Sequence, residues 1–338
     1  MIVIMRHGAS RAQIANVVAR VEQMGCQADV SQGEEHTVIG VIGNGRPLDR
    51  EQLERMSGVE RTVPVAKPFK RASRDFHPLD TVVPINGVQI GGEQIVVIAG
   101  PCAVESREQL FSSAAAVHKA GARVLRGDAF KPRTSPYSFQ GLGERGLELL
   151  AEARAEFGMP FVAEVVDPRD VELLASYADI IRIGTRNMAN FTLLAELGRQ
   201  DKPVMLKRGF TATVEEWLNA AEYIYKEGNH HIILCERGIR TFESQTRNTL
   251  DISAVPVVRH LSHLPVLVDP SHSGGRSTLV APLSLAAVAV RSNGVMIDVH
   301  PSPETALVDG AQAILPRDFA DLMGEIRAVA AALGVDLV

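Results

Sequence analysis

Cysteine is scarce in this chain, and the few cysteines that occur are widely spaced. Only Cys26, Cys102 and Cys235 are present among the 338 residues. An odd number of distant cysteines does not form a disulfide framework, so the sequence predicts a protein of a reducing compartment, the cytoplasm. We interpret Cys26 and Cys235 as structural residues, whereas Cys102 belongs to a group considered below.

The sequence also lacks an excess of positive charge and a long apolar run. Its 35 Lys and Arg stand against 40 Asp and Glu, a net charge of −5, which predicts no surface for nucleic acid or membrane. The longest apolar stretch, "TLVAPLSLAAVAV", contains Pro282 and Ser284 and is shorter than a membrane-spanning helix. The beginning, "MIVIMRHGAS", has no basic segment followed by a long apolar one, so we expect no signal peptide.

Residues 1–66 alternate between two kinds of hydrophobic pattern. The segments "MIVIM", "CQADVSQG", "HTVIGVIG" and "VERTVPVA" read as strands. A helix is expected after Ser10, because apolar residues from Ile14 to Val21 recur at helical spacing, and a second helix is expected in "LDREQLERMSG". The resulting order, βαββαβ, is that of a ferredoxin-like domain. The charged segment 67–80 contains two prolines and is predicted to be a linker.

Residues 81–338 are predicted to form a (β/α)8 TIM barrel. The segment opens with a hairpin around Asn86-Gly87, a dipeptide typical of turns in which both central residues have positive φ. Eight apolar strands separated mostly by helical stretches follow at 95–102, 122–128, 161–166, 179–185, 203–209, 231–238, 265–272 and 294–300. Eight alternations in about 250 residues favour a closed barrel. A doubly wound open sheet is the alternative within the α/β class.

Ionisable side chains stand at or just after the ends of these strands, where a TIM barrel builds its active site. One group is cationic and consists of Arg126, Lys131, Arg133, Arg186, Lys207 and Arg237. Several cations at one barrel mouth predict an anionic ligand that carries phosphate or carboxylate groups. The alternative is that they form ion pairs with Glu164, Glu236 and nearby carboxylates.

A second group offers ligands for a metal ion. Its members are Cys102, His272, Asp298 and Asp309, from the first, seventh and eighth strands and the loop after the eighth. Thiolate, imidazole and carboxylate suit Mn²⁺, Fe²⁺, Co²⁺ or Zn²⁺, and the three strands are neighbours in a closed barrel. The alternative is separate roles, with Cys102 as a small buried residue, His272 as a structural residue and Asp309 in a turn.

Seven motifs together carry a family resemblance: "GPCAVES", "KPRTSPYSFQGLG", "IGTRN", "LKRGF", "ILCERGIRTFE", "TRNTLDISAVP" and "DPSHSGGR". They resemble the 3-deoxy-D-arabino-heptulosonate-7-phosphate (DAHP) synthases, most closely the microbial subgroup with a ferredoxin-like N-terminal domain. The resemblance covers nearly the whole chain. It implies a transferase that condenses phosphoenolpyruvate with erythrose 4-phosphate and water and releases phosphate. This is the first step of the shikimate pathway toward chorismate and the aromatic amino acids.

The resemblance also implies roles for individual residues. The residues implied to hold phosphoenolpyruvate are Arg126, Lys131, Arg186, Lys207 and Arg237. Those implied to hold erythrose 4-phosphate are Pro132, Arg133 and Thr134. The implied metal ligands are Cys102, His272, Asp298 and Asp309. Cys102, His272 and Lys131 are therefore the expected catalytic residues, and either Lys131 or a metal-bound water is expected to transfer a proton to the nascent alkoxide.

Two further expectations follow from the resemblance. The family motif "EVHP" reads "DVHP" here, so Asp298 replaces a glutamate, which leaves the preferred metal open. Feedback inhibition by tyrosine or phenylalanine is implied for residues 1–66, within a homotetramer. The alternative for this domain is assembly alone.

Three alternative functions stay open at the level of sequence. The nearest is 3-deoxy-D-manno-octulosonate 8-phosphate synthase, which uses arabinose 5-phosphate; its motif resembles KANRSS, whereas "KPRTSPYS" favours the four-carbon aldose. A Schiff-base aldolase would use Lys207 and would have no need of the metal ligands. A catalytically inactive barrel could serve as a sensor of aromatic amino acids.

Overall fold

The computed structural model describes residues 1–33, 36–43, 50–63 and 68–338. The chain divides into two compact units, the first comprising Met1–Asp80 with His260–His263, and the second Thr81–Arg259 with Leu264–Val338. Within the described residues, no helix is long and apolar enough to cross a membrane. The domain boundaries at 66 and 80 stay a prediction.

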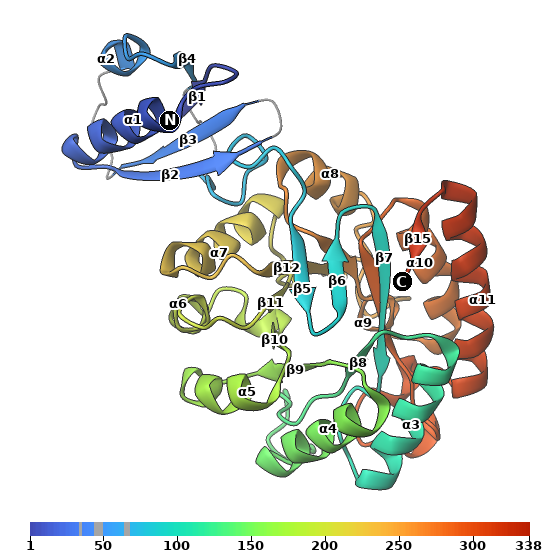
Figure 1. Cartoon of the computed structure of the whole chain (residues 1–338). Helices are drawn as coiled ribbons and strands as arrows, with labels where there is room; N and C mark the ends of the chain where they lie inside the picture. Colours follow the sequence, from blue (N-terminus) through green and yellow to red (C-terminus); the bar gives the residue numbers. More distant parts are fainter. Residues whose placement is uncertain (34–35, 44–49, 64–67) are drawn as a thin grey trace. The chain divides into compact units, whose positions relative to one another are not determined.

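The first unit contains the predicted ferredoxin-like domain (Figure 1). Its elements are β1 (Ile2–Met5), α1 (Arg11–Gln23), β2 (Gln27–Gln32), β3 (Thr37–Ile42), α2 (Arg50–Glu54) and β4 (Val59–Val63). The antiparallel sheet has the order β2-β3-β1-β4, which confirms the predicted βαββαβ fold. Ser10 caps α1 by accepting the N–H of Gln13, and Val17 and Val21 bury the inner face of this helix. The last residues of the predicted fourth strand, 64–66, lie outside the described residues.

Residues 68–80, most of the predicted linker, are packed within the first unit rather than extended. Phe69, Ala72 and Phe76 are buried. The ring of Phe76 occupies the space that a Cβ at Gly40 would need, so this glycine permits the packing. The segment therefore has a folded conformation of its own.

The second unit is a closed barrel of eight parallel strands (Figure 1). A hairpin of β5 (Val82–Ile85) and β6 (Val88–Gly91) precedes it, and Asn86 and Gly87 both have positive φ, as predicted. The barrel strands are β7 (Gln94–Gly100), β8 (Val124–Arg126), β9 (Phe161–Val165), β10 (Ile180–Ile183), β11 (Val204–Lys207), β12 (Ile232–Glu236), β13 (Val266–Val268) and β14 (Gly294–Asp298). Pairing of β14 with β7 closes the sheet, so the open-sheet alternative is wrong. A short strand, β15 (Asp336–Leu337), adds to β7.

Helices surround the barrel, as Figure 1 shows. They are α3 (Arg107–Ala120), α4 (Glu144–Phe157), α5 (Val171–Tyr177), α6 (Phe191–Gly198), α7 (Val214–Glu227), α8 (Ala254–Leu261), α9 (Pro270–Gly274), α10 (Ser277–Ala289) and α11 (Pro316–Leu333). The helix α9 replaces the end of the predicted strand 265–272, which stops at Val268. The cause is local: the Asp269 side chain accepts the N–H of His272 and caps the helix, and Pro270 occupies its first turn.

The barrel interior changes from apolar to charged along the strands. A buried cluster combines inward side chains of the strands, such as Ile98, Val162 and Met296, with Val83 and Ile90 of the hairpin. Because side chains alternate along a strand, the residue two positions after each inward apolar residue also points inward. In β8, β10 and β11 these next residues are Arg126, Arg182 and Lys207. The fold thus places a layer of charge directly above the core.

Candidate active site

A cavity of about 270 Å³ opens at the C-terminal ends of the barrel strands. The predicted site residues that line it are Lys131, Pro132, Arg133, Thr134, Arg186, Lys207, Arg237, His272 and Asp309. Other cations and aromatic groups at the wall are Arg182, Arg247 and Phe210. The loop after β8 therefore forms one wall of the cavity, and residues at or just after the ends of β10, β11 and β12 contribute to the other walls.

Three arginines of this cavity lack a carboxylate partner within ion-pair distance among the described residues. Arg237 donates to the carbonyl oxygens of Gly238 and His272, at 3.2 and 3.1 Å. Arg186 donates to the Thr134 hydroxyl at 3.4 Å, and Arg133 donates to the Phe139 carbonyl at 3.3 Å. Burial lowers the pKa of Arg237 to about 10, so this guanidinium is still charged at neutral pH. Such cations are available to an anionic ligand.

The other predicted cations are neutralised by buried carboxylates. Lys207 lies 2.5 Å from Asp269, and Lys131 lies 2.8 Å from Asp128. Arg126 is fully buried, forms an ion pair with Asp298 and lies outside the cavity lining. The ion-pairing alternative thus describes half of the cationic group, and the partners are nearby carboxylates other than Glu164 and Glu236. Glu164 pairs with Arg182, and Glu236 pairs with Arg208.

Three of the predicted metal ligands converge on a common point. The Cys102 Sγ lies 3.7 Å from His272 Nε2 and 3.5 Å from an Asp309 carboxylate oxygen, and that oxygen lies 3.5 Å from His272 Nε2. Ligand atoms bonded to one metal at about 2.0–2.3 Å in a tetrahedron lie roughly 3.3–3.8 Å apart. The triangle therefore fits a divalent ion in both its donor chemistry and its spacing.

The imidazole of His272 is oriented by a second carboxylate. Its Nδ1 lies 2.9 Å from Asp269, so the proton on this nitrogen is favoured and Nε2 is left to face Cys102 and Asp309. Burial opposes protonation of the ring, but the charges of Asp269 and Asp298 outweigh it and raise the pKa of His272 to about 9. A metal ion must therefore compete with a proton for this histidine.

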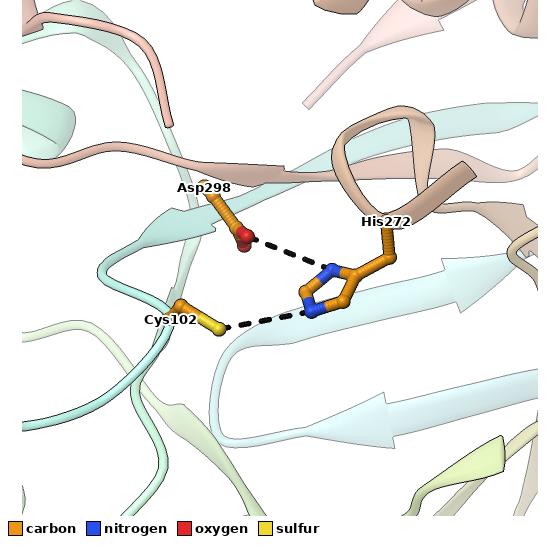
Figure 2. A group of neighbouring side chains, drawn as sticks. All are labelled: Cys102, His272 and Asp298. Carbon is orange, nitrogen blue, oxygen red and sulfur yellow. Dashed lines mark hydrogen bonds and ion pairs between the residues drawn. The ribbon is translucent and has the colours of Figure 1, made fainter. Parts of the chain in front are cut away.

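Asp298 faces the Nδ1 side of the His272 ring, whereas Cys102 faces Nε2 (Figure 2). One carboxylate oxygen pairs with Arg126, and the other accepts the Gln312 amide at 2.6 Å and lies 3.6 Å from His272 Nδ1. Ligand atoms of Cys102, His272 and Asp298 nevertheless all lie within 4.8 Å of one another, so the shortened carboxylate is within reach of a shared ion.

Several charged or polar residues of the site were not identified from the sequence. They are Asp128, Arg182, Arg247, Asp269 and Gln312. Arg182 and Asp269 follow the two-residue period of β10 and β13, so strict alternation could have indicated them. Asp128 and Arg247 lie in loops and Gln312 lies in a single 3-10 turn, Gly310–Gln312, where no periodicity reveals the direction of a side chain.

The fold and the site together define a class of protein: a TIM-barrel enzyme with an anion-binding cavity beside a group suited to a divalent metal. Comparison with known families identifies the members of this class to which the chain is related. Residues 74–331 match the DAHP synthetase I family, and residues 1–67 match the DAHP synthase ferredoxin-like domain. The chain belongs to the DAHP synthetase I family.

Individual relatives support the same assignment. A phospho-2-dehydro-3-deoxyheptonate aldolase of Thermotoga maritima is 53% identical over 335 residues, 99% of each chain. A crystal structure of phospho-2-dehydro-3-deoxyheptonate aldolase (DAHP synthase) from that organism covers 100% of this chain and 99% of its own, with 52% identity and a TM-score of 0.80. A truncated form of the Thermotoga maritima synthase covers 79% of this chain and 98% of its own, with 53% identity and a TM-score of 0.75.

Similarity of this extent assigns DAHP synthase activity to the chain, a transferase reaction of the shikimate pathway. A 2-dehydro-3-deoxyphosphooctonate aldolase of Syntrophotalea carbinolica is only 33% identical, over 68% of this chain and 87% of its own. The octulosonate alternative is therefore less well supported than the heptulosonate reaction.

Proposed function

We propose that the cavity binds phosphoenolpyruvate and erythrose 4-phosphate next to each other, beside a metal ion. The observation that carries this proposal is the position of Arg133, Arg186 and Arg237, which lack carboxylate partners among the described residues and line one cavity together with His272 and Asp309. Phosphate and carboxylate groups are the natural partners of such guanidinium groups.

Phosphoenolpyruvate is proposed to occupy the inner part of the cavity. The residues proposed to hold it are Arg126, Lys131, Arg186, Lys207 and Arg237. Arg186 and Arg237 both lie near the Phe210 ring, at 5.6 and 4.9 Å from its centroid. Both guanidinium groups can therefore bind one ligand next to this ring. Arg126 has the least structural support, because it is fully buried behind Asp298.

Erythrose 4-phosphate is proposed to bind along the loop after β8. Pro132, Arg133 and Thr134 line the cavity there and are the residues proposed to hold its phosphate. The Lys131 side chain extends from this loop to Cys102, with its Nζ 3.2 Å from the sulfur. From this position its ammonium can reach both substrates. This position makes it our candidate for proton transfer to the nascent alkoxide.

The proposed metal ligands are Cys102, His272, Asp298 and Asp309, and the ion is Mn²⁺, Fe²⁺, Co²⁺ or Zn²⁺. When bound, such an ion supplies Lewis-acid polarisation of the aldehyde oxygen. The chain contributes the charged surroundings: Arg186 and Arg237 stabilise the charge of the departing phosphate. Burial opposes protonation of Lys131, but the neighbouring Asp128 outweighs it and raises the pKa of the ammonium, so Lys131 carries a proton at neutral pH.

The first 66 residues are proposed to be a regulatory domain that mediates feedback inhibition by tyrosine or phenylalanine within a homotetramer, followed by residues 67–80 and the catalytic barrel from residue 81. None of the proposed substrate or metal residues lies in this domain. Metabolic feedback on the first step of a pathway also fits the proposed location in the cytoplasm.

The test is release of phosphate from phosphoenolpyruvate in the presence of different aldose phosphates. We expect turnover with erythrose 4-phosphate, little with arabinose 5-phosphate, loss of turnover after chelation and recovery with Mn²⁺. Preference for the five-carbon aldose, or full activity in metal-free enzyme, would overturn the proposal. Trapping of a Lys207 adduct by borohydride would instead support a Schiff-base aldolase.

A further inference from the structure

A buried carboxylate connects the catalytic loop to the charged interior of the barrel. Asp128 has no exposed surface and belongs to the loop between β8 and α4, three residues before Lys131. One of its oxygens lies 2.8 Å from Lys131 Nζ and 2.5 Å from Arg182 Nη2. Its other oxygen accepts the backbone N–H of Glu164 at 3.1 Å. We propose that Asp128 is a positioning residue that fixes the ammonium of Lys131 for the reaction, with Arg182 as its anchor.

The anchor is rigid because it is part of the barrel itself. Arg182 lies in β10 directly opposite Glu164 of β9, and its guanidinium bridges the carboxylates of Glu164 and Asp128, at 2.7 and 2.5 Å. It is 1% exposed. A carboxylate held by Arg182 and by a backbone N–H of a barrel strand has little freedom to move. Asp128 therefore ties a loop residue to two strands.

The flexible side chain of Lys131 requires a fixed partner. It has four rotatable bonds and ends in a compact charge that can bind any nearby acceptor. The Cys102 sulfur is 3.2 Å away, and the ammonium also lies within the cavity that receives the substrates. Without Asp128, the ammonium has the sulfur and the substrate phosphates as its remaining partners. Asp128 thus holds the ammonium between the two subsites in the absence of substrate.

Asparagine at this position would break the arrangement without a large change in shape. In Asp128 one oxygen accepts from two cations, and the other oxygen accepts a backbone N–H. An asparagine amide has only one oxygen, and its NH₂ group cannot accept, so one of these two sets of contacts is lost. A displacement of about 1 Å of a reacting group can lower the rate roughly 10²-fold. The binding of phosphoenolpyruvate by Arg186 and Arg237 does not involve Asp128. The loss is therefore expected mainly in kcat. Because Lys131 is itself among the residues proposed to hold phosphoenolpyruvate, KM for this substrate is expected to rise by a smaller factor.

The experiment compares Asp128→Asn, Arg182→Gln and the double variant by steady-state kinetics with Mn²⁺-loaded full-length enzyme. We expect kcat of Asp128→Asn to fall roughly 10²-fold and KM for phosphoenolpyruvate to rise by a smaller factor. Arg182→Gln should show part of this loss, and the double variant should be no worse than Asp128→Asn, because both act through one contact. Unchanged kcat, a change confined to KM, or losses that multiply in the double variant would overturn the proposal.

The double variant also provides a second route to the measurement, since it removes an anion and a cation together and so leaves the net charge of the buried cluster unchanged. If Asp128→Asn is insoluble, the kcat and KM of the double variant decide in the same way. Asp179→Asn is the matched control. Asp179 is another buried aspartate that pairs with an arginine, Arg154, and accepts a backbone N–H, that of Phe161. It lies just before β10 at the opposite end of the barrel, so its substitution should lower stability and leave kcat unchanged.

The inference rests on the proposed role of Lys131, and the two can fail separately. A Lys131→Met variant with wild-type turnover would remove that role from the proposed function. An inactive Lys131→Met variant combined with wild-type kcat in Asp128→Asn would overturn only the role of Asp128.

Discussion

The Asp298 carboxylate faces Nδ1 of His272, at 3.6 Å, whereas Nε2 of the same ring faces Cys102 and Asp309. Asp298 is also held by Arg126 and Gln312. The residue that departs from the expected motif thus stands to the side of the triangle formed by the proposed ligands Cys102, His272 and Asp309.

The first prediction concerns this shortened side chain. Asp298→Glu should extend the carboxylate toward the triangle and tighten metal binding, while Asp298→Asn should weaken it about 10- to 100-fold, the usual effect of disturbing groups around a metal site. Competition of each purified variant with a fluorescent chelator for Mn²⁺ measures the affinity without recourse to activity. Equal and negligible effects of both changes would show that Asp298 is not a ligand.

The second prediction separates the two substrate subsites. Arg133→Ala should raise KM for erythrose 4-phosphate more than KM for phosphoenolpyruvate, and Arg186→Ala should do the reverse. A hydrogen bond to a charged group contributes about 1.5–3 kcal/mol, so each affected KM should rise by roughly one to two powers of ten. Kinetics with each substrate varied in turn decide this. If both variants lose affinity for the same substrate, the proposed subsites are wrong.

Much of this organisation was predictable, because hydrophobic periodicity and the polar residues after each strand reflect local geometry. The motif "LVDPSHSGG" shows the limit: the apolar run indicates β13, but the cap of Asp269 turns the following residues into α9 and aims His272 inward from a helix. The partner of each charge was not predictable. Arg182 meets Asp128 only after the barrel forms, since 54 positions separate them in the sequence.

The third prediction concerns the space around Glu164. The backbone of Gly184 is extended, with φ −70° and ψ 159°, so alanine is conformationally acceptable there. Its Cβ, however, would lie 2.0 Å from a Glu164 carboxylate oxygen. Gly184→Ala should therefore displace this carboxylate from Arg182 and destabilise the barrel by about 1–3 kcal/mol, the range for overpacking.

Thermal unfolding measures the effect of Gly184→Ala, and Gly324→Ala is the control. Gly324 lies in α11 with no atom within 4 Å of an added Cβ. This substitution should stabilise the enzyme by about 0.5–1 kcal/mol, because alanine favours a helix over glycine. A Gly184→Ala enzyme as stable as the wild type would contradict the packing described.

The fourth prediction is a loss of stability in mild acid caused by His263. Burial lowers the pKa of this histidine to about 4, and its Nε2 lies 2.7 Å from the carbonyl oxygen of Arg71, which requires a proton on that nitrogen. The unfolded chain takes up a proton near pH 6.5 whereas the folded chain does not. The contribution of the neutral His263 to the free energy of unfolding is therefore complete above about pH 6.5. It decreases as the pH falls toward 4, by about 3 kcal/mol in total.

His263→Gln keeps a donor for the Arg71 carbonyl but does not titrate. Its melting temperature should therefore fall less between pH 7 and pH 5 than that of the wild type, when both are measured by calorimetry in the same buffers. Identical pH dependence in the two proteins would show that another group is responsible.

The last prediction tests whether the ferredoxin-like domain regulates the barrel. A fragment beginning at Lys70 removes the sheet β2-β3-β1-β4 and retains residues 70–80, in which the N–H of Arg74 donates to the Leu261 carbonyl oxygen. Keeping this segment leaves the Leu261 carbonyl oxygen with its hydrogen-bond donor. The truncated form of the Thermotoga maritima synthase covers 79% of this chain, a share close to that of the fragment. Inhibition requires that the amino acid bind one arrangement of the enzyme better than another, and the domain is our candidate for its binding site.

The fragment should therefore be active and metal-dependent but insensitive to tyrosine and phenylalanine, whereas the full-length chain should be inhibited. Titration of both proteins with each amino acid, with leucine as the control, measures this. If the full-length enzyme is itself insensitive at millimolar concentrations, the domain serves assembly, and sedimentation of the two proteins should then differ in oligomeric state.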